Sequence, residues 1–274
     1  MNYILIFFVA HWTSSVFCQT FFLHRYGAHS MFQMNRFWER FFHLATYITQ
    51  GPSYLNPRAY AILHRMHHAY SDTEKDPHSP HYFKDVFSMM LVTKKTYDDF
   101  AYDRNEPERR FDGRVPTWPA LDKLGQNWPV RILWCGGYIA FYYAFAPSAI
   151  WYALLPFHFL MGPTHGAIVN WGGHKYGYRN FDNKDKSVNS LFFDFLTFGE
   201  LFQNNHHKFG MSPKFSARWF EVDPAWPLIR LFDFLGIIKI TSQQRMRYPA
   251  PVQDGVGEPA AFIEPDADYP VAAE

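Results

Sequence analysis

Cysteine is nearly absent from this chain, which has two in 274 residues, Cys18 and Cys135. Both lie in apolar runs, where we expect small buried side chains, and two cysteines supply neither a disulfide framework nor a cysteine-based metal site. Excess charge of either sign is also lacking, because the formal net charge is +1. The sequence therefore gives no electrostatic reason to expect a nucleic acid as partner.

Charged side chains are missing from the first 23 residues, which contain no Asp, Glu, Lys or Arg. As a helix, residues 1–23 would be about 35 Å long, which is enough to cross a bilayer core of about 30 Å. The run lacks the basic start and the small-residue cleavage site of a signal peptide. We therefore expect a retained membrane span near the N-terminus.

A second run without charge extends over residues 132–173 and is too long for one span. It is interrupted near Pro147, which predicts two spans, about 129–147 and 149–171, joined by a tight hairpin. Pro156 and Pro163 are expected to kink the second span, because proline removes a backbone donor. Basic residues flank the hairpin at Lys123, Arg131, Lys175 and Arg179. The side to which it returns is therefore predicted to be cytoplasmic.

The other segments complete an expected all-α fold, an integral membrane helical bundle with a helical cytosolic cap. An aromatic helix over residues 37–50 is short for a crossing and is expected at the membrane interface. The apolar run 191–202 predicts a helix that delivers the motif after it. The tail has six acidic residues and no Lys or Arg, which is typical of disorder. The expected organisation is a membrane domain over 1–248, with its cap formed by 51–128 and 172–248, and a tail over 249–274.

Histidine is abundant in the chain, with 14 residues. Two segments repeat nearly the same pattern, HRMHH and QNNHH, and a third, HRYGAH, adds two more histidines. On a helix, positions i, i+3 and i+4 share one face, so each triplet is predicted to converge on a point, as metal ligands do. The predicted topology places all three segments on the same side of the membrane. Including the histidine of GGHK, the predicted metal ligands are His24, His29, His64, His67, His68, His174, His206 and His207.

Eight clustered histidines predict a metal site, because buried imidazoles without partners are costly. Imidazole suits Zn, Cu, Fe and Ni, so the ligand type does not name the metal. One tetrahedral zinc needs three or four ligands, whereas eight imply two metals of higher coordination. The triplets also lack the glutamate of an HExxH zinc hydrolase. A dinuclear iron site that activates oxygen is favoured, with a zinc hydrolase and a non-enzymatic metal-binding membrane protein as alternatives.

The segments HRYGAH, HRMHHAYSDTEKDPHSP, NWGGHKYGYRNFD and GELFQNNHH resemble the histidine motifs of membrane fatty acyl desaturases, most closely the acyl-CoA delta-9 type, over about residues 15–240. The resemblance implies two iron ions held by the eight histidines, with Asn170 bound through water and no catalytic residue beyond this metal site. Gln203 stands where the family has histidine. An amide oxygen is a weaker ligand, so one iron is expected to be held loosely, through water, or with an open position.

The resemblance also implies a reaction and its partners. The expected activity is to introduce a cis double bond into a long-chain acyl substrate, CoA-linked or lipid-linked, with O2 and two electrons. The electrons would come from a separate ferredoxin or cytochrome b5 type donor with its reductase. A di-iron hydroxylase of alkanes, sterols or carotenoids is the main alternative. Eukaryotic relatives have an additional preceding span that is not in this sequence, which suggests a bacterial type. We expect it in the inner (cytoplasmic) membrane among lipids, with its site facing the cytoplasm.

Several polar residues near the motifs are expected to support the histidines. Asp72, Asp76 and Glu200 are predicted to orient ligand rings by accepting hydrogen bonds from them. Arg25 and Arg65 each follow a predicted ligand and are expected to pair with a carboxylate or with a substrate head group. The remaining histidines are assigned to structure, and these are His11, His43, His78, His81, His158 and His165.

Overall fold

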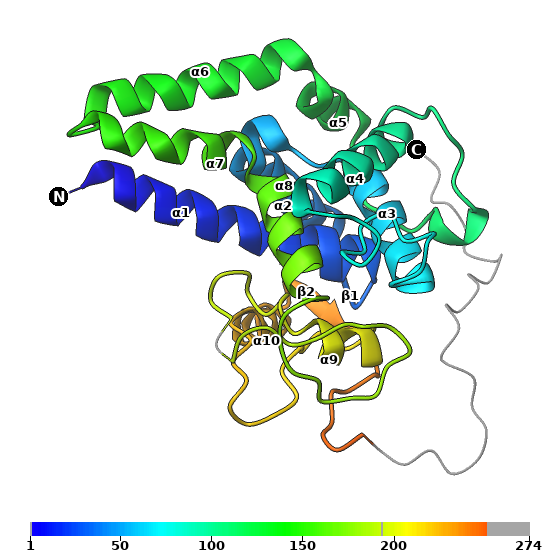
Figure 1. The fold of residues 1–274 in the computed structure, drawn as a ribbon. Coiled ribbons are helices and arrows are strands. Elements are labelled where there is room, and N and C mark those ends of the chain that lie inside the picture. Colours follow the sequence, from blue (N-terminus) through cyan, green and yellow to red (C-terminus); the bar gives the residue numbers. More distant parts are fainter. Residues whose placement is uncertain (1, 193, 251–274) are drawn as a thin grey trace.

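The computed structural model describes residues 2–192 and 194–250, and it is mostly helical (Figure 1). The elements in chain order are α1 (Tyr3–Cys18), η1 (Gln19–Ala28), β1 (Phe32–Met34), α2 (Arg36–Gln50), η2 (Gly51–Ser53), α3 (Pro57–Tyr70), α4 (Val86–Ala101), η3 (Arg109–Phe111), α5 (Pro119–Gln126), α6 (Trp128–Phe145), η4 (Ala149–Leu154), α7 (Leu155–Phe159), α8 (Met161–Ala167), η5 (Ile168–Gly172), α9 (Gln203–Lys208), α10 (Ala225–Phe234) and β2 (Ile238–Ile240). The predicted helical fold class is confirmed at this level. The acidic tail lies almost entirely outside the described residues.

The N-terminal helix combines α1 with its π-helical continuation η1. Asn2 caps its start by accepting a hydrogen bond from the backbone N–H of Leu5. Among the described residues this helix, Tyr3–Ala28, is the one long and apolar enough to cross a membrane. It covers the first predicted span.

The predicted hairpin is present, but its second arm is not one helix. Asn127 caps α6, which ends at Phe145, and the chain turns back before η4. The return arm consists of η4, α7, α8 and η5, and Leu160 leaves the helical region between α7 and α8 with φ −122°. Pro156 and Pro163 contribute no backbone donor to this arm, which explains its division into short pieces. That residues 129–147 and 149–171 cross a membrane stays a prediction.

Three helical arms lie side by side at one end of the molecule. α1, α6 and α7 contact one another pairwise and run roughly parallel or antiparallel in Figure 1. Large apolar side chains on these arms are exposed, among them Leu133 at 74% and Tyr143 at 84%. An apolar face of this kind is unusual on a molecule surrounded by water.

The other end of the molecule is built around an aromatic core. Phe21 and Phe22 of η1 pack with Phe42 of α2 and with Phe202 and Phe215 from the C-terminal half. β1 and β2 pair antiparallel, with Phe32 opposite Ile240, and tie the chain after η1 to the segment after α10. The amphipathic helix α2 packs on α1 and α5, while α3 packs on η1 and α4. This packing brings η1, α3 and α9 together.

The prediction of a helix over 191–202 is wrong for the described part of this segment, which forms turns before α9. The Asp194 carboxylate accepts hydrogen bonds from the backbone N–H groups of Thr197, at 2.8 Å, and Leu201, at 2.9 Å. Phe198 and Gly199 both have positive φ, at 55° and 90°. These local bonds compete with helix formation, as aspartate side chains commonly do.

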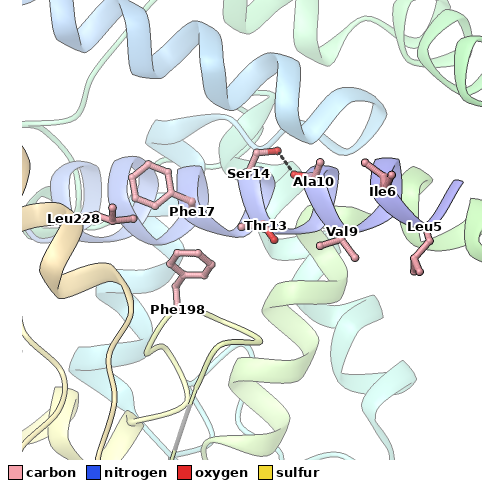
Figure 2. Close-up of a pocket in the computed structure, with 9 residues that line it drawn as sticks. All are labelled: Leu5, Ile6, Val9, Ala10, Thr13, Ser14, Phe17, Phe198 and Leu228. Atoms are coloured by element: carbon pink, nitrogen blue, oxygen red, sulfur yellow. Dashed lines mark hydrogen bonds between the residues drawn. The ribbon is translucent and has the colours of Figure 1, made fainter. Parts of the chain in front are cut away.

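An apolar groove of about 650 Å³ follows the outer face of α1 (Figure 2). It runs from Leu5 and Val9 to Phe17, where Phe198 and Leu228 close it. None of the predicted histidine ligands lines this groove. The candidate site therefore lies elsewhere, at the other end of the same helix.

Candidate metal centre

The change from α-helix to π-helix in η1 aligns the two histidines of HRYGAH. The backbone N–H of His29 donates to the carbonyl of His24 at 3.1 Å, which is the i to i+5 bond of a π-helix. On an α-helix, residues five apart point about 140° away from each other. The wider turn of η1 places both imidazoles on the same side.

The histidines of HRMHH are presented by α3, which starts at Pro57 with Asn56 as its cap. His64 and His68 are four residues apart, and their rings are 4.6 Å from each other between centroids. His67 points to a different neighbour, with its ring 4.8 Å from that of His174. The short helix α9 likewise presents His206 and His207 in two directions.

Five histidines form the first of two groups. One ring nitrogen each of His24, His29, His64, His68 and His206 lies within 4.8 Å of the others. Measured between Nε2 atoms, His29 is 2.7 Å from His64, while His206 is 3.0 Å from His68 and 3.1 Å from His24. Nitrogens bound to one metal at about 2.1 Å and at right angles would be about 3.0 Å apart. These spacings fit the ligand set of a single ion.

Three histidines, His67, His174 and His207, form the second group. The Nδ1 atom of each lies 2.9 Å from a carboxylate, in pairs formed by His67 with Asp76, His174 with Asp72, and His207 with Asp185. The three Nε2 atoms are buried and have no hydrogen-bond partner in the described structure. A carboxylate that holds Nδ1–H leaves the Nε2 lone pair free, as at metal-binding histidines. The residues present therefore fit a metal ion here.

The prediction that each triplet converges on one point is wrong. His64 and His68 belong to the five-histidine group, whereas His67 belongs to the three-histidine group. His206 and His207 are divided in the same way. Adjacent helical residues point about 100° apart, so one helix serves two neighbouring groups rather than one.

Burial and mutual proximity lower the pKa values of several of these imidazoles, whereas contact with Asp76 raises the pKa of His67 against the effect of burial. Burial, and then the neighbouring histidines, lower the pKa values of His64, His68 and His206 well below the ordinary value. Burial also lowers the pKa of His207 to about 4, against the opposing effect of Asp185. Neutral imidazole is the form that binds metal, so these four histidines are ready to bind one near neutral pH.

The carboxylates beside the three-histidine group are ionised. Burial opposes ionisation of Asp72, Asp76 and Asp185, but the histidines in contact with them lower the pKa of each carboxyl below its ordinary value. Asp185 was not predicted from the sequence. It lies 22 residues before His207 in a polar loop, and no local spacing signal marks it.

Glu200 and Arg25 join the five-histidine group to the protein core. Glu200 Oε2 is 2.5 Å from Nδ1 of His24, and its other oxygen accepts from Arg25 at 3.0 Å. Arg25 is fully buried and also reaches Asp223 at 3.4 Å. Arg65 instead donates to the backbone carbonyls of residues 27, 28, 111 and 113. Arg25 thus contacts the carboxylate that lies against His24, whereas Arg65 links two segments of backbone through hydrogen bonds.

Gln203 lies beside the three-histidine group. Its side chain is buried and donates to the backbone carbonyl of Glu200 at 2.6 Å. A Cβ atom at Gly173 would be 2.3 Å from Cγ of Gln203, so this side chain packs against the residue that precedes His174. Asn170 lies in η5, four residues before His174. The departure from the family motif therefore falls at the group with fewer histidines.

The six remaining histidines are mostly paired within the structure. His11 and His158 are 2.6 Å apart between Nδ1 atoms, His43 meets Asp122 at 3.0 Å, and His81 lies 2.9 Å from the carbonyl of His174. His165 and His78 are both buried, and neither ring nitrogen of either one has a hydrogen-bond partner in the described structure.

Comparison with known proteins places the chain among enzymes that act on fatty acyl groups. A model of the family described as fatty acid desaturase matches residues 1–233. An acyl-CoA C20 delta-5 desaturase of Anemone leveillei is 30% identical over 249 residues, which cover 85% of this chain and 72% of the relative. An sn-1 stearoyl-lipid 9-desaturase of Anabaena variabilis is 28% identical over 230 residues, which cover 83% of this chain and 79% of the relative.

Proposed function

This chain belongs to the fatty acid desaturase family of oxidoreductases, and on that premise we propose that it introduces a cis double bond into a long-chain fatty acyl substrate. The observation that carries the proposal is the pair of histidine groups, one of five and one of three, with converging ring nitrogens. In the proposed reaction, adjacent methylenes lose two hydrogens, and these hydrogens combine with O2, two electrons and two protons to give two molecules of water. Two iron ions held by these groups would supply the oxidising power when bound.

The protein's own carboxylates orient four of the eight imidazoles. Asp72, Asp76 and Asp185 accept from the Nδ1 atoms, which leaves Nε2 as the ligand atom in the three-histidine group. In the five-histidine group, Glu200 holds Nδ1 of His24. Rings fixed in this way need little rearrangement when metal binds, which favours tight binding.

The metals are assigned as iron by family membership together with ligand chemistry. Imidazole binds several transition metals, and two groups with eight histidines suit metals of higher coordination than tetrahedral zinc. Unactivated C–H bonds do not react with acid–base side chains, so an oxidising metal site suits this substrate class. Water held by Asn170 and the amide of Gln203 are proposed as weaker ligands.

The protein is proposed to lie in a membrane with its metal groups at the cytoplasmic side, as expected for a bacterial inner-membrane enzyme. The helix Tyr3–Ala28 and the exposed apolar side chains of α6 support membrane contact. The histidine groups lie beyond the ends of the three arms, where the polar cap begins. The acyl substrate, CoA-linked or lipid-linked, would enter from the membrane, and a separate ferredoxin or cytochrome b5 type donor would approach the cap.

The test is expression in a host of known lipid composition, followed by fatty-acid analysis with location of double bonds. A new unsaturated acyl species is the expected result. A matched chain with His206→Ala, which removes a central member of the five-histidine group, is expected to yield none. An alcohol in place of an alkene would support the hydroxylase alternative, and the absence of any new product from metal-loaded protein would contradict an acyl-modifying function.

A further inference from the structure

A buried histidine outside the proposed ligand set lies against the three-histidine group. His78 is 3% exposed, and neither of its ring nitrogens has a hydrogen-bond partner in the part of the chain that the structure describes. Buried polar atoms are nearly always paired, so two orphaned nitrogens on one ring require an explanation. His165 has the same unpartnered nitrogens, but only His78 lies beside a histidine of a candidate metal group, where a metal would account for them.

The position of His78 points to that ligand. Its ring is 4.4 Å from the ring of His67, between centroids. One ligand atom each of His67, Asp76 and His78 lies within 4.8 Å of the other two. Ligands of one metal are about 3.0 Å apart at right angles and about 4.2 Å apart when opposite. His78 therefore lies next to His67 but outside the 4.8 Å grouping of His67 with His174 and His207, so its ring must move in order to share a metal with them.

The backbone holds His78 at this place. Its N–H donates to Oδ1 of Asp76 at 3.1 Å, while Oδ2 of the same carboxylate accepts from Nδ1 of His67 at 2.9 Å. One buried aspartate thus positions both histidines. The bond to the backbone N–H fixes the place of the His78 main chain next to His67, while the His78 ring itself is held by no hydrogen bond in the described structure.

The three-histidine group also lacks a ligand that the family motif would provide. Gln203 occupies the first position of QNNHH, beside this group, and an amide oxygen binds a transition metal more weakly than imidazole does. The group has three imidazoles against five in its neighbour. A further imidazole at the three-histidine group would reduce this difference in the number of strong ligands.

We infer that His78 is a ligand of the metal at the three-histidine group, where it compensates for Gln203. This inference rests on the proposed function only in requiring that a metal is bound there. It assigns a metal-binding role to a histidine that is not among the eight predicted ligands, although it lies in the same segment as HRMHH.

The test measures metal binding rather than turnover. The full chain is purified in detergent as wild type, His78→Asn, Gln203→His and the double variant, and bound iron per chain is measured after dialysis against a chelator. The His78→Asn variant is expected to keep the iron of the five-histidine group. It is expected to bind the iron of the three-histidine group at least ten-fold more weakly. The double variant is expected to recover it. Cobalt(II) replaces iron in a parallel series, and His78→Asn is expected to change its visible spectrum.

His165→Asn is the matched control, because His165 is equally buried and its ring nitrogens are equally unpartnered, but it lies in α8 away from both groups. It is expected to bind two irons as the wild type does. The melting temperature of metal-free His78→Asn is expected to equal or exceed that of the metal-free wild type, because an unpaired buried imidazole is removed.

Two irons in His78→Asn at wild-type affinity, with an unchanged cobalt spectrum, would overturn this inference and leave the proposed function intact. A wild-type chain that binds no iron or cobalt would overturn the proposed function, and the inference with it.

Discussion

At the scale of single residues, each member of the three-histidine group is oriented by its own aspartate. The three aspartates come from two loops, Asp72 and Asp76 from the segment after α3 and Asp185 from the segment after η5. Asp72 also accepts from the hydroxyl of Ser79 at 2.6 Å and from the backbone N–H of Lys186 at 2.7 Å. The Asp72 carboxylate thereby links both loops to His174 of the three-histidine group.

Asp185→Asn is expected to weaken iron binding at the three-histidine group by about 10- to 100-fold. The amide would no longer fix the Nδ1–H tautomer of His207, whose Nδ1 is 2.9 Å from this carboxylate. Iron per chain, measured against a graded series of chelator concentrations, checks this. Asp182→Asn is the control, since Asp182 is an exposed aspartate in the same loop. Equal iron affinity in both variants would contradict the role given to Asp185.

At the scale of elements, irregular helices position the ligands. η1 and η5 are π-helical, and each lies directly before or around a histidine of the groups. A π-helical turn changes the direction of the side chains that follow it. Sequence periodicity assumes an α-helix, and for this reason the orientation of His29 relative to His24 was not predictable from spacing alone.

Gly173→Ala is expected to lower both the melting temperature and the iron content. The new Cβ would lie 2.3 Å from Cγ of Gln203 and 2.7 Å from the backbone carbonyl oxygen of Val169, so the end of η5 must shift next to His174. Gly166→Ala is the control within the same arm, because no atom lies within 4 Å of its Cβ position. The control is expected to be neutral or to stabilise by up to about 1 kcal/mol. Thermal unfolding in detergent measures both, and equal behaviour of the two variants would contradict the close packing at Gly173.

Ile139→Lys tests whether α6 lies in a membrane. Ile139 is 46% exposed in the middle of α6, and a lysine at the centre of a spanning helix costs about 2.5–3.5 kcal/mol. The amount of this variant that remains in alkali-washed membranes is expected to be lower than that of the wild type. Tyr102→Lys, at a position 38% exposed just after α4 in the cap, is expected to have no effect. Equal recovery of both variants in the membrane fraction would argue against a lipid-facing α6.

At the scale of the whole molecule, the metal groups join parts of the chain that are far apart in sequence. The two histidine groups receive histidines from η1, α3, the segment after η5 and α9. The most distant contact joins His24 to His206 across 182 positions. The same region contains the aromatic core and the β1–β2 pair. A metal that binds only the folded state therefore stabilises the whole assembly rather than one loop.

Withdrawal of iron is expected to lower the melting temperature of the purified chain. At free iron about 100 times the dissociation constant, binding at one site adds about 2.7 kcal/mol, which corresponds to roughly 5–10 °C for a chain of this size. Differential scanning measurements with chelator, and then with iron restored, check the shift and its reversal. Magnesium, which prefers oxygen ligands, is the control and is expected not to restore it. Identical melting with and without iron would contradict a metal bound to the folded chain.

The family, the clustered histidines and most helices could be read from the amino-acid sequence, because histidine motifs, helical periodicity and apolar run lengths are local properties. His24, His29 and the triplets could be named from motifs alone. The packing of distant segments divides these histidines into groups of five and three, brings Asp185 to His207, and places Gln203 and His78 next to the smaller group. Those relations depend on which elements pack together over long separations, and on π-helical turns and side-chain bonds such as those of Asp194, which local patterns do not encode.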